Sequence, residues 1–158
     1  MHKFIEQWAI ENPVQKHRFE FLIRDVSDDC ALAALYVLKP ELNNYNVSTV
    51  TRTTEQGFHM RLHRDNYHVQ KNPPVTGRPI FTFERHTEID PEFVMVLYYS
   101  DHVKDFKGGV FQFSDGTQIK PKRGLCSVFH ANDVHEVTLQ TSGIRKITLF
   151  TFRPKNCP

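Results

Sequence analysis

The spacing of hydrophobic and polar residues predicts a helix, a strand and a second helix in the first quarter of the chain. Apolar residues recur at helical spacing over residues 3–11. Over residues 18–25 they alternate with charged residues, a two-residue period that is typical of a half-buried strand. Ser27 then offers an N-cap for a helix that Pro40 ends. We therefore expect N-terminal helices flanking one strand.

The rest of the chain is patterned as short strands. Residues 93–99 form the most apolar run and predict a central strand buried on both faces. Turn signals such as Gly108-Gly109 separate the later segments. Closely spaced strands with turns favour antiparallel sheets. The sequence thus predicts a mainly β protein with N-terminal helices, folded as a double-stranded β-helix (jelly roll), with strands at 47–54, 58–63, 93–99, 110–113, 127–129, 134–139 and 145–152.

A long irregular segment interrupts the strands between residues 66 and 90. It contains several prolines and one short strand-like piece at 80–83. Long connections inside a compact domain are commonly functional or disordered. Two interpretations have equal weight: a lid or binding loop for substrate, and a mobile surface insertion.

Length and charge narrow the classes of protein. The 158 residues suit one domain, which we place at 1–158, with an N-terminal support at 1–45 and a jelly-roll catalytic core at 58–153. Twenty basic residues against eighteen acidic ones give no bulk charge that favours nucleic acid or membrane. Three scattered cysteines and the lack of a long apolar run fit an intracellular, cytoplasmic protein.

Four residues carry the candidate chemistry. The pair His63-x-Asp65 follows one predicted strand, and His135 and Arg145 belong to the last two. With nine histidines in the chain, the doublet alone is weak. Two imidazoles and one carboxylate on one face of an octahedron are the ligand set of non-haem Fe(II) oxygenases, and a guanidinium can bind the carboxylate of an acid chelated to the metal. The residue types therefore point to a metal-dependent oxygenase.

Several longer segments add a family resemblance. Residues 58–152 resemble the catalytic core of Fe(II)/2-oxoglutarate-dependent dioxygenases, in their prolyl and lysyl hydroxylase branch. The matching segments are His63-Arg64-Asp65-Asn66, Val96-Leu97-Tyr98-Tyr99-Ser100-Asp101, Phe106-Lys107-Gly108-Gly109-Val110-Phe111-Gln112-Phe113, Lys120-Pro121-Lys122-Arg123-Gly124, His135-Glu136-Val137 and Gly143-Ile144-Arg145.

The resemblance implies a role for each matching residue. His63, Asp65 and His135 would ligate iron, and Arg145 would bind the distal carboxylate of 2-oxoglutarate. Tyr98 would donate its hydroxyl to the same carboxylate, with Tyr99 in its place if the register is shifted by one. Relatives also carry a tyrosine about ten residues before the first ligand, and here that position falls among threonines, near residues 51–53. The implied cofactors are Fe(II), 2-oxoglutarate, O2 and ascorbate.

The resemblance favours hydroxylation of an unactivated C–H bond in a peptidyl proline, ahead of a lysine. The expected partner is a peptide or protein rather than nucleic acid or membrane, and the oligomeric state stays open. Alternative substrates are a free amino acid, another small molecule or a nucleobase. A non-enzyme alternative is a cupin-like or inactive oxygenase-fold binding module, although a pure binding surface needs neither three metal ligands nor Arg145.

Overall fold

A computed structural model describes residues 18–63, 65 and 91–155. In chain order its elements are β1 (Arg18–Leu22), α2 (Asp28–Leu38), η1 (Pro40–Asn44), β2 (Asn46–Thr54), β3 (Met60–His63), β4 (Phe93–Tyr98), β5 (Phe106–Lys107), β6 (Phe111–Phe113), β7 (Gln118–Ile119), β8 (Leu125–His130), β9 (His135–Val137), β10 (Ser142–Gly143) and β11 (Arg145–Arg153).

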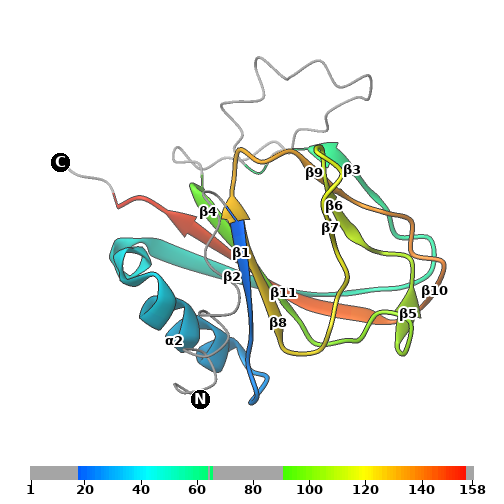
Figure 1. Ribbon diagram of the computed structural model, residues 1–158, viewed down its shortest axis with the longest axis horizontal. Helices are drawn as coiled ribbons and strands as arrows, with labels where there is room; N and C mark the ends of the chain where they lie inside the picture. Colours follow the sequence, from blue (N-terminus) through cyan, green and yellow to red (C-terminus); the bar gives the residue numbers. More distant parts are fainter. Residues whose placement is uncertain (1–17, 64, 66–90, 156–158) are drawn as a thin grey trace.

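Two sheets form the body of the molecule (Figure 1). Within the described residues, one has five strands in the order β1-β8-β4-β11-β2, and the other has four in the order β3-β9-β6-β7. A small pair, β10-β5, joins them at one end. The pairs within these sheets are antiparallel. This arrangement is a double-stranded β-helix, so the predicted fold class is confirmed.

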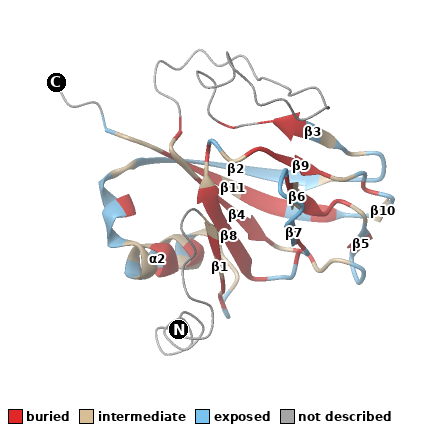
Figure 2. Ribbon diagram, turned by 45° about the horizontal axis from the view of Figure 1, so that its top comes forward, coloured by how far each residue is buried: buried red, intermediate tan, exposed pale blue. Residues whose placement is uncertain are grey.

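Strand β4 runs through the middle of the protein. Val94, Val96 and Tyr98 belong to the core between the two sheets, whereas Met95 and Leu97 belong to the core under α2. Each of these five side chains is at most 2% exposed. In Figure 2 β4 is drawn in red, as are β8 and much of β11 on either side of it. The predicted central strand, buried on both faces, is confirmed because alternate residues of one apolar run fill two separate cores.

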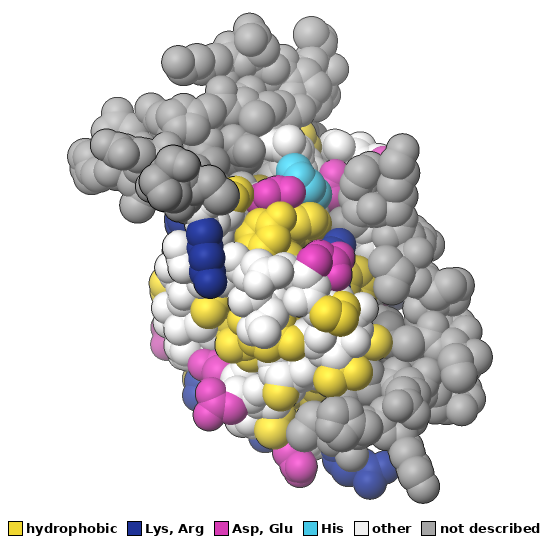
Figure 3. Space-filling model, turned by 90° about the vertical axis from the view of Figure 1, so that its left-hand side faces the viewer, with side chains coloured by type: hydrophobic (Ala, Val, Ile, Leu, Met, Phe, Trp, Pro, Cys, Tyr) yellow, Lys and Arg dark blue, Asp and Glu magenta, His cyan; other side chains and the backbone are white. Residues whose placement is uncertain are grey.

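Helix α2 covers the outer face of the five-stranded sheet. Ser27 is its N-cap and accepts a hydrogen bond at Oγ from the Cys30 N–H, at 3.1 Å, as the sequence predicts. Ala31, Ala34 and Leu35 are buried against the sheet. Hydrophobic side chains are visible between charged ones on this side of the molecule (Figure 3). The helix thus buries one apolar stripe.

The remaining strands follow the predicted positions with shifted ends. The structure adds three two-residue strands that the sequence does not predict: β5, β7 and β10. It also adds the 3-10 helix η1, for which Pro40 supplies the N-terminal position. The expected helix at 3–11, the loop at 66–90 and its strand at 80–83 lie outside the described residues.

Among the described residues, no helix combines the length and the hydrophobicity that crossing a bilayer requires.

Candidate functional site

The pairing of β3 with β9 places two histidines side by side. His63 and His135 are direct cross-strand partners, and their ring centroids lie 4.2 Å apart. The register shifts between Met60 and His63, so that three steps along β3 match two along β9. Such a bulge inserts one residue into a strand and re-aims the side chains beyond it. As a result Met60 and His63 line the same cavity although they are three residues apart.

Asp65 completes a three-residue cluster with these histidines. Its backbone N–H donates to the Ala131 carbonyl at 3.0 Å, which fixes the chain just beyond β3. Its Oδ1 lies 3.5 Å from His63 Nε2, and its Oδ2 lies 3.4 Å from His135 Nε2. Cis ligands about 2.1 Å from one octahedral ion lie roughly 3 Å apart, so this spacing is close to that of a shared metal.

The two imidazoles are oriented by backbone carbonyls. His63 Nδ1 lies 2.7 Å from the Arg61 oxygen, and His135 Nδ1 lies 2.8 Å from the Asp133 oxygen. A carbonyl oxygen only accepts, so each Nδ1 carries a proton, and the Nε2 atom of each ring faces Asp65. Burial lowers the pKa of His135 to about 4, against the opposing effect of the Asp65 carboxylate. At neutral pH this imidazole is therefore uncharged and able to ligate a cation.

Aromatic side chains surround the His135 ring. Phe111 from β6 stacks on it, with centroids 4.7 Å apart and an interplanar angle of 19°. Phe129 from β8 meets the same ring edge-on at 4.9 Å. Both phenylalanines are buried, and the sequence pattern marks them only as core residues. Their packing holds the imidazole in one orientation and keeps water from its faces.

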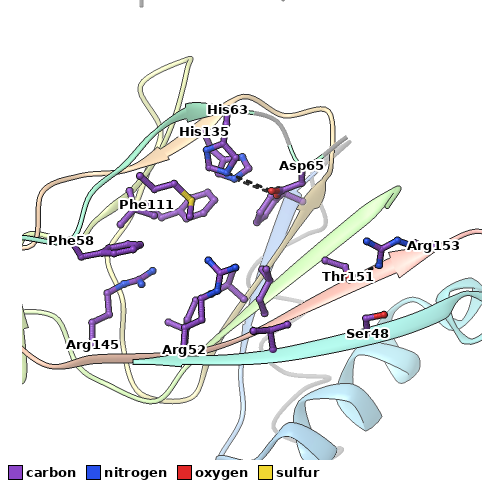
Figure 4. A pocket seen from close by; sticks show the side chains of 17 residues that line it. Ser48, Arg52, Phe58, His63, Asp65, Phe111, His135, Arg145, Thr151 and Arg153 are labelled. Atoms are coloured by element: carbon purple, nitrogen blue, oxygen red, sulfur yellow. Dashed lines mark hydrogen bonds and ion pairs between the residues drawn. The ribbon is translucent and has the colours of Figure 1, made fainter. Parts of the chain in front are cut away.

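The histidine–aspartate cluster lies at one wall of a cavity between the two sheets, with a volume of about 530 Å³. The opposite wall is formed by β11 and β2, from which Arg145 and Arg52 extend into the cavity (Figure 4). Most of the lining is apolar. The lining residues are Ser48, Val50, Arg52, Phe58, Met60, His63, Asp65, Val96, Phe111, Phe129, His135, Val137, Arg145, Ile147, Leu149, Thr151 and Arg153.

Arg145 is held at the first position of β11. Its side chain is 2% exposed, and its guanidinium carbon lies 5.9 Å from the Phe58 ring centroid and 5.7 Å from that of Tyr98. A Cβ at Gly109 would lie 3.3 Å from Arg145 Cδ, so the glycine leaves room for the arginine stem. Within the described part of the chain, no acceptor bonds to Arg145 Nε. The guanidinium is thus held in place while its Nε–H group can still donate a hydrogen bond.

The two neighbouring tyrosines on the β4 side point in opposite directions. Tyr98 is fully buried toward the cavity side, and its hydroxyl has no hydrogen-bond partner among the described residues. Tyr99 packs under α2, where its hydroxyl donates to Asp28 Oδ1 at 2.6 Å. Burial raises the pKa of Tyr98, and the Arg145 charge opposes that shift. Burial and the Asp28 carboxylate raise the pKa of Tyr99 to about 12. Of the two, Tyr98 is the one beside Arg145.

These features fit a metal ion and an acidic co-substrate. Two Nε2 atoms and a carboxylate within 4.8 Å of one another form a mixed nitrogen and oxygen set of the kind that suits Fe(II). Buried polar atoms rarely lack partners, yet Tyr98 Oη and Arg145 Nε lack them within the described residues. A carboxylate in the cavity would supply an acceptor to Arg145, which lines it. The metal-ligand atoms of the cluster therefore fit Fe(II), and the hydrogen-bond donors across the cavity fit an acidic co-substrate.

Comparison with known proteins agrees with a site for a metal ion and an acidic co-substrate. Residues 48–153 match the model of the 2OG-Fe(II) oxygenase superfamily. The chain belongs to this superfamily. The match covers more than half of the chain and includes the three clustered residues and Arg145. No curated protein sequence matches the chain.

Solved structures of this superfamily share the fold. A viral collagen prolyl hydroxylase from Paramecium bursaria Chlorella virus-1, in complex with 2OG, superposes with a TM-score of 0.58 at 16% identity, over 98% of this chain and 87% of its own. A Pseudomonas putida prolyl-4-hydroxylase gives 0.51 at 18% identity, over 81% and 63%. HygX from Streptomyces hygroscopicus, with nickel and 2-oxoglutarate bound, gives 0.50 at 14% identity, over 98% and 76%.

Family and geometry together imply Fe(II) and 2-oxoglutarate as cofactor and co-substrate. The sequence prediction that the chain is an Fe(II)/2-oxoglutarate-dependent oxygenase is confirmed at the level of the superfamily. The structure brings His63, Asp65, His135 and Arg145 to one cavity, with Tyr98 against Arg145. Phe58, Phe111 and Arg52 also line this cavity, and no local sequence signal marks them as parts of a site.

Proposed function

We propose that this protein hydroxylates a prolyl residue of a peptide or protein in an Fe(II)- and 2-oxoglutarate-dependent reaction. In this proposal His63, Asp65 and His135 hold the iron. The convergence of these three side chains on one point, across a cavity from Arg145, is the observation that carries the proposal. Iron bound there supplies the activation of O2, which couples conversion of 2-oxoglutarate to succinate and CO2 with insertion of one oxygen atom into a C–H bond.

The side chains around the cluster have separate tasks. Arg145 binds the distal carboxylate of 2-oxoglutarate through charge-assisted hydrogen bonds, which are strong in a buried place. Tyr98 donates its hydroxyl to the same carboxylate. Phe111 and Phe129 hold the His135 ring and limit the access of water. The Arg61 and Asp133 carbonyls keep both imidazoles in the tautomer that binds a metal through Nε2.

Two fold neighbours support the choice of proline. The viral structure is named as a collagen prolyl hydroxylase and the Pseudomonas putida structure as a prolyl-4-hydroxylase. At 16% and 18% identity their likeness concerns the fold. Proline specificity is therefore an inference from shared architecture, and it needs a substrate test.

The test is a succinate-release assay with a library of proline-containing peptides, Fe(II), 2-oxoglutarate, O2 and ascorbate. We expect some peptides to stimulate succinate release and to gain one oxygen atom at proline by mass spectrometry. A parallel series contains free proline, free lysine and a lysine peptide library. Stimulation by free amino acids alone would contradict peptidyl hydroxylation. Binding of iron and 2-oxoglutarate without succinate formation for any substrate would favour a binding module.

The two tyrosines give a matched pair of variants. Tyr98→Phe removes a buried hydroxyl that has no described partner, so we expect it to raise the free energy of unfolding of the ligand-free protein by about 1 kcal/mol. The same variant should bind 2-oxoglutarate roughly fivefold more weakly, the worth of one hydrogen bond. Denaturant unfolding and calorimetric titration of the Mn(II)-loaded protein measure the two effects.

Tyr99→Phe is the control for this prediction. It removes the hydrogen bond to Asp28, and we expect a loss of about 1 kcal/mol in stability with unchanged 2-oxoglutarate affinity. If Tyr99→Phe weakened 2-oxoglutarate binding while Tyr98→Phe did not, the role would pass to Tyr99.

A further inference from the structure

The β2–β11 wall of the cavity carries a cation for which the proposed reaction gives no role. Arg52 is the pocket-facing residue opposite Ile147 of β11, and Arg145 lies two residues from Ile147 on the same strand. Diagonal neighbours on one sheet face have Cβ atoms about 7–8 Å apart. Unlike Arg145, Arg52 is exposed, and no carboxylate in the described part of the chain pairs with it. It therefore stands nearer the mouth of the cavity than the buried anchor.

The cavity keeps a positive surplus after the proposed ligands are in place. Its described lining includes Arg52 and Arg145, which have no carboxylate partner in the described part of the chain, and one carboxylate, Asp65. A divalent metal and dianionic 2-oxoglutarate cancel in formal charge, and metal-bound imidazoles are neutral. Two positive charges against one negative leave a formal surplus of one. In a mostly apolar cavity, such a surplus favours an anionic group on whatever else enters.

Strand β2 also favours a particular kind of molecule. Among the described residues it is the outermost strand of its sheet, it is nine residues long, and eight of its residues are exposed. The outer edge of such a strand presents a row of backbone N–H and C=O groups to which an extended peptide can pair. Ser48, Val50 and Arg52 face the cavity from this strand. A peptide paired along β2 would thus lie beside Arg52 and present alternate side chains on the same face of the sheet.

We infer that the substrate is an acidic, extended peptide that lies along β2, with one anionic side chain paired to Arg52. This inference rests on the proposed hydroxylase function and adds the class of substrate. The anion is a carboxylate or a phosphate, since a guanidinium binds both through two parallel hydrogen bonds.

A charged residue on an edge strand has a second possible role, which is to prevent pairing with other chains. A lysine or a glutamate serves that role as well as an arginine. Reversal of the charge separates the two roles, because only a partner in the cavity makes the preferred peptide change with the sign at position 52.

The experiment measures binding of fluorescein-labelled peptides to protein loaded with Mn(II) and 2-oxoglutarate. Each twelve-residue peptide has one proline and one variable position two, four or six residues away on either side, occupied by Glu, Gln, Lys or phosphoserine. We expect the best Glu or phosphoserine peptide to bind about tenfold more tightly than its Gln counterpart, and the difference to shrink with salt. The Glu and phosphoserine arms identify which anion is preferred.

Arg52→Glu supplies the deciding variant. We expect it to lose the preference for Glu and to prefer Lys at the same position, when 2-oxoglutarate is present at a concentration that saturates the variant. Lys146→Glu is the matched control, since it makes the same charge change on the opposite face of β11, over Tyr99. It should keep the wild-type preference.

Three results would overturn the inference: equal binding of Glu and Gln peptides at every spacing, a Glu preference that survives in Arg52→Glu, or a single-stranded oligonucleotide that binds more tightly than the best acidic peptide. Mass spectrometry of the same peptides with Fe(II) and O2 tests the hydroxylase function separately. Equal hydroxylation and equal binding of Glu and Gln peptides would support prolyl hydroxylation and contradict the preference for an acidic peptide. Arg52-dependent binding of acidic peptides without formation of hydroxyproline would support the acidic-peptide site and contradict prolyl hydroxylation.

Discussion

Replacement of His135 by alanine is expected to abolish succinate formation and to weaken metal binding by more than about 100-fold. Removal of an outer hydrogen-bond partner of a metal-bound histidine already costs roughly 10–100-fold, so loss of the ligand itself should cost more. His135 Nε2 lies 3.4 Å from Asp65 Oδ2 and has no substitute among the clustered donors that the structure describes. Calorimetric titration of Mn(II) and the succinate assay measure the two effects.

Two companions keep this prediction decisive. His135 is 2% exposed and packs against Phe111, so the alanine variant loses core contacts as well. Asp65→Asn preserves size while it removes the anionic ligand, and it should abolish metal binding in a protein that unfolds as one cooperative unit. His59→Ala alters an exposed histidine and should behave as wild type. Normal Mn(II) affinity in both His135→Ala and folded Asp65→Asn would contradict the proposed ligands.

Replacement of Arg145 by alanine is expected to raise the 2-oxoglutarate requirement by roughly 30- to 1,000-fold, with little change in metal affinity. Loss of one partner from a buried, hydrogen-bonded ion pair costs about 2–4 kcal/mol, which corresponds to that range. Arg145 is buried between Phe58 and Tyr98, at the cavity wall opposite the histidines. The dependence of succinate release on 2-oxoglutarate concentration and calorimetry of the Mn(II)-loaded variant give the two numbers.

Variants at and beside this position sharpen the result. Arg145→Lys keeps the charge but loses the planar pair of donors, so its 2-oxoglutarate affinity should fall between wild type and Arg145→Ala. Lys146→Ala changes the next residue, which faces the other side of the sheet over Tyr99, and should leave the affinity unchanged. An Arg145→Ala enzyme with wild-type 2-oxoglutarate affinity would require a different anchor for the acid.

The hydrophobic pattern predicts the strands that are long enough to show a period. The apolar run at 93–99 predicts β4, because consecutive apolar residues over this length are typical of a strand that is buried on both faces. Two-residue strands such as β5, β7 and β10 give no periodic signal, since non-local pairing partners define them. Helix α2 is visible in advance because Ser27 and Pro40 act locally at its two ends.

The residues of the site also fall into two groups, those that a local sequence segment predicts and those that strand pairing places. His63, Asp65, His135 and Arg145 belong to recognisable segments, so the sequence predicts their shared role. Arg52 does not, since its orientation depends on the register that places it opposite Ile147 of β11. The bulge in β3 likewise sets which residues of that strand face the cavity, and no local residue pattern announces it. Side chains placed by pairing between distant strands therefore needed the structure.

A crystal structure of the protein with Mn(II) and 2-oxoglutarate, grown without oxygen, tests most directly whether the metal and the co-substrate bind in this one cavity. We expect one Mn(II) ion bound by His63, Asp65 and His135, with 2-oxoglutarate chelated to it and its distal carboxylate on Arg145. An ion bound without either histidine or the aspartate, or 2-oxoglutarate placed away from Arg145, would contradict the proposed site.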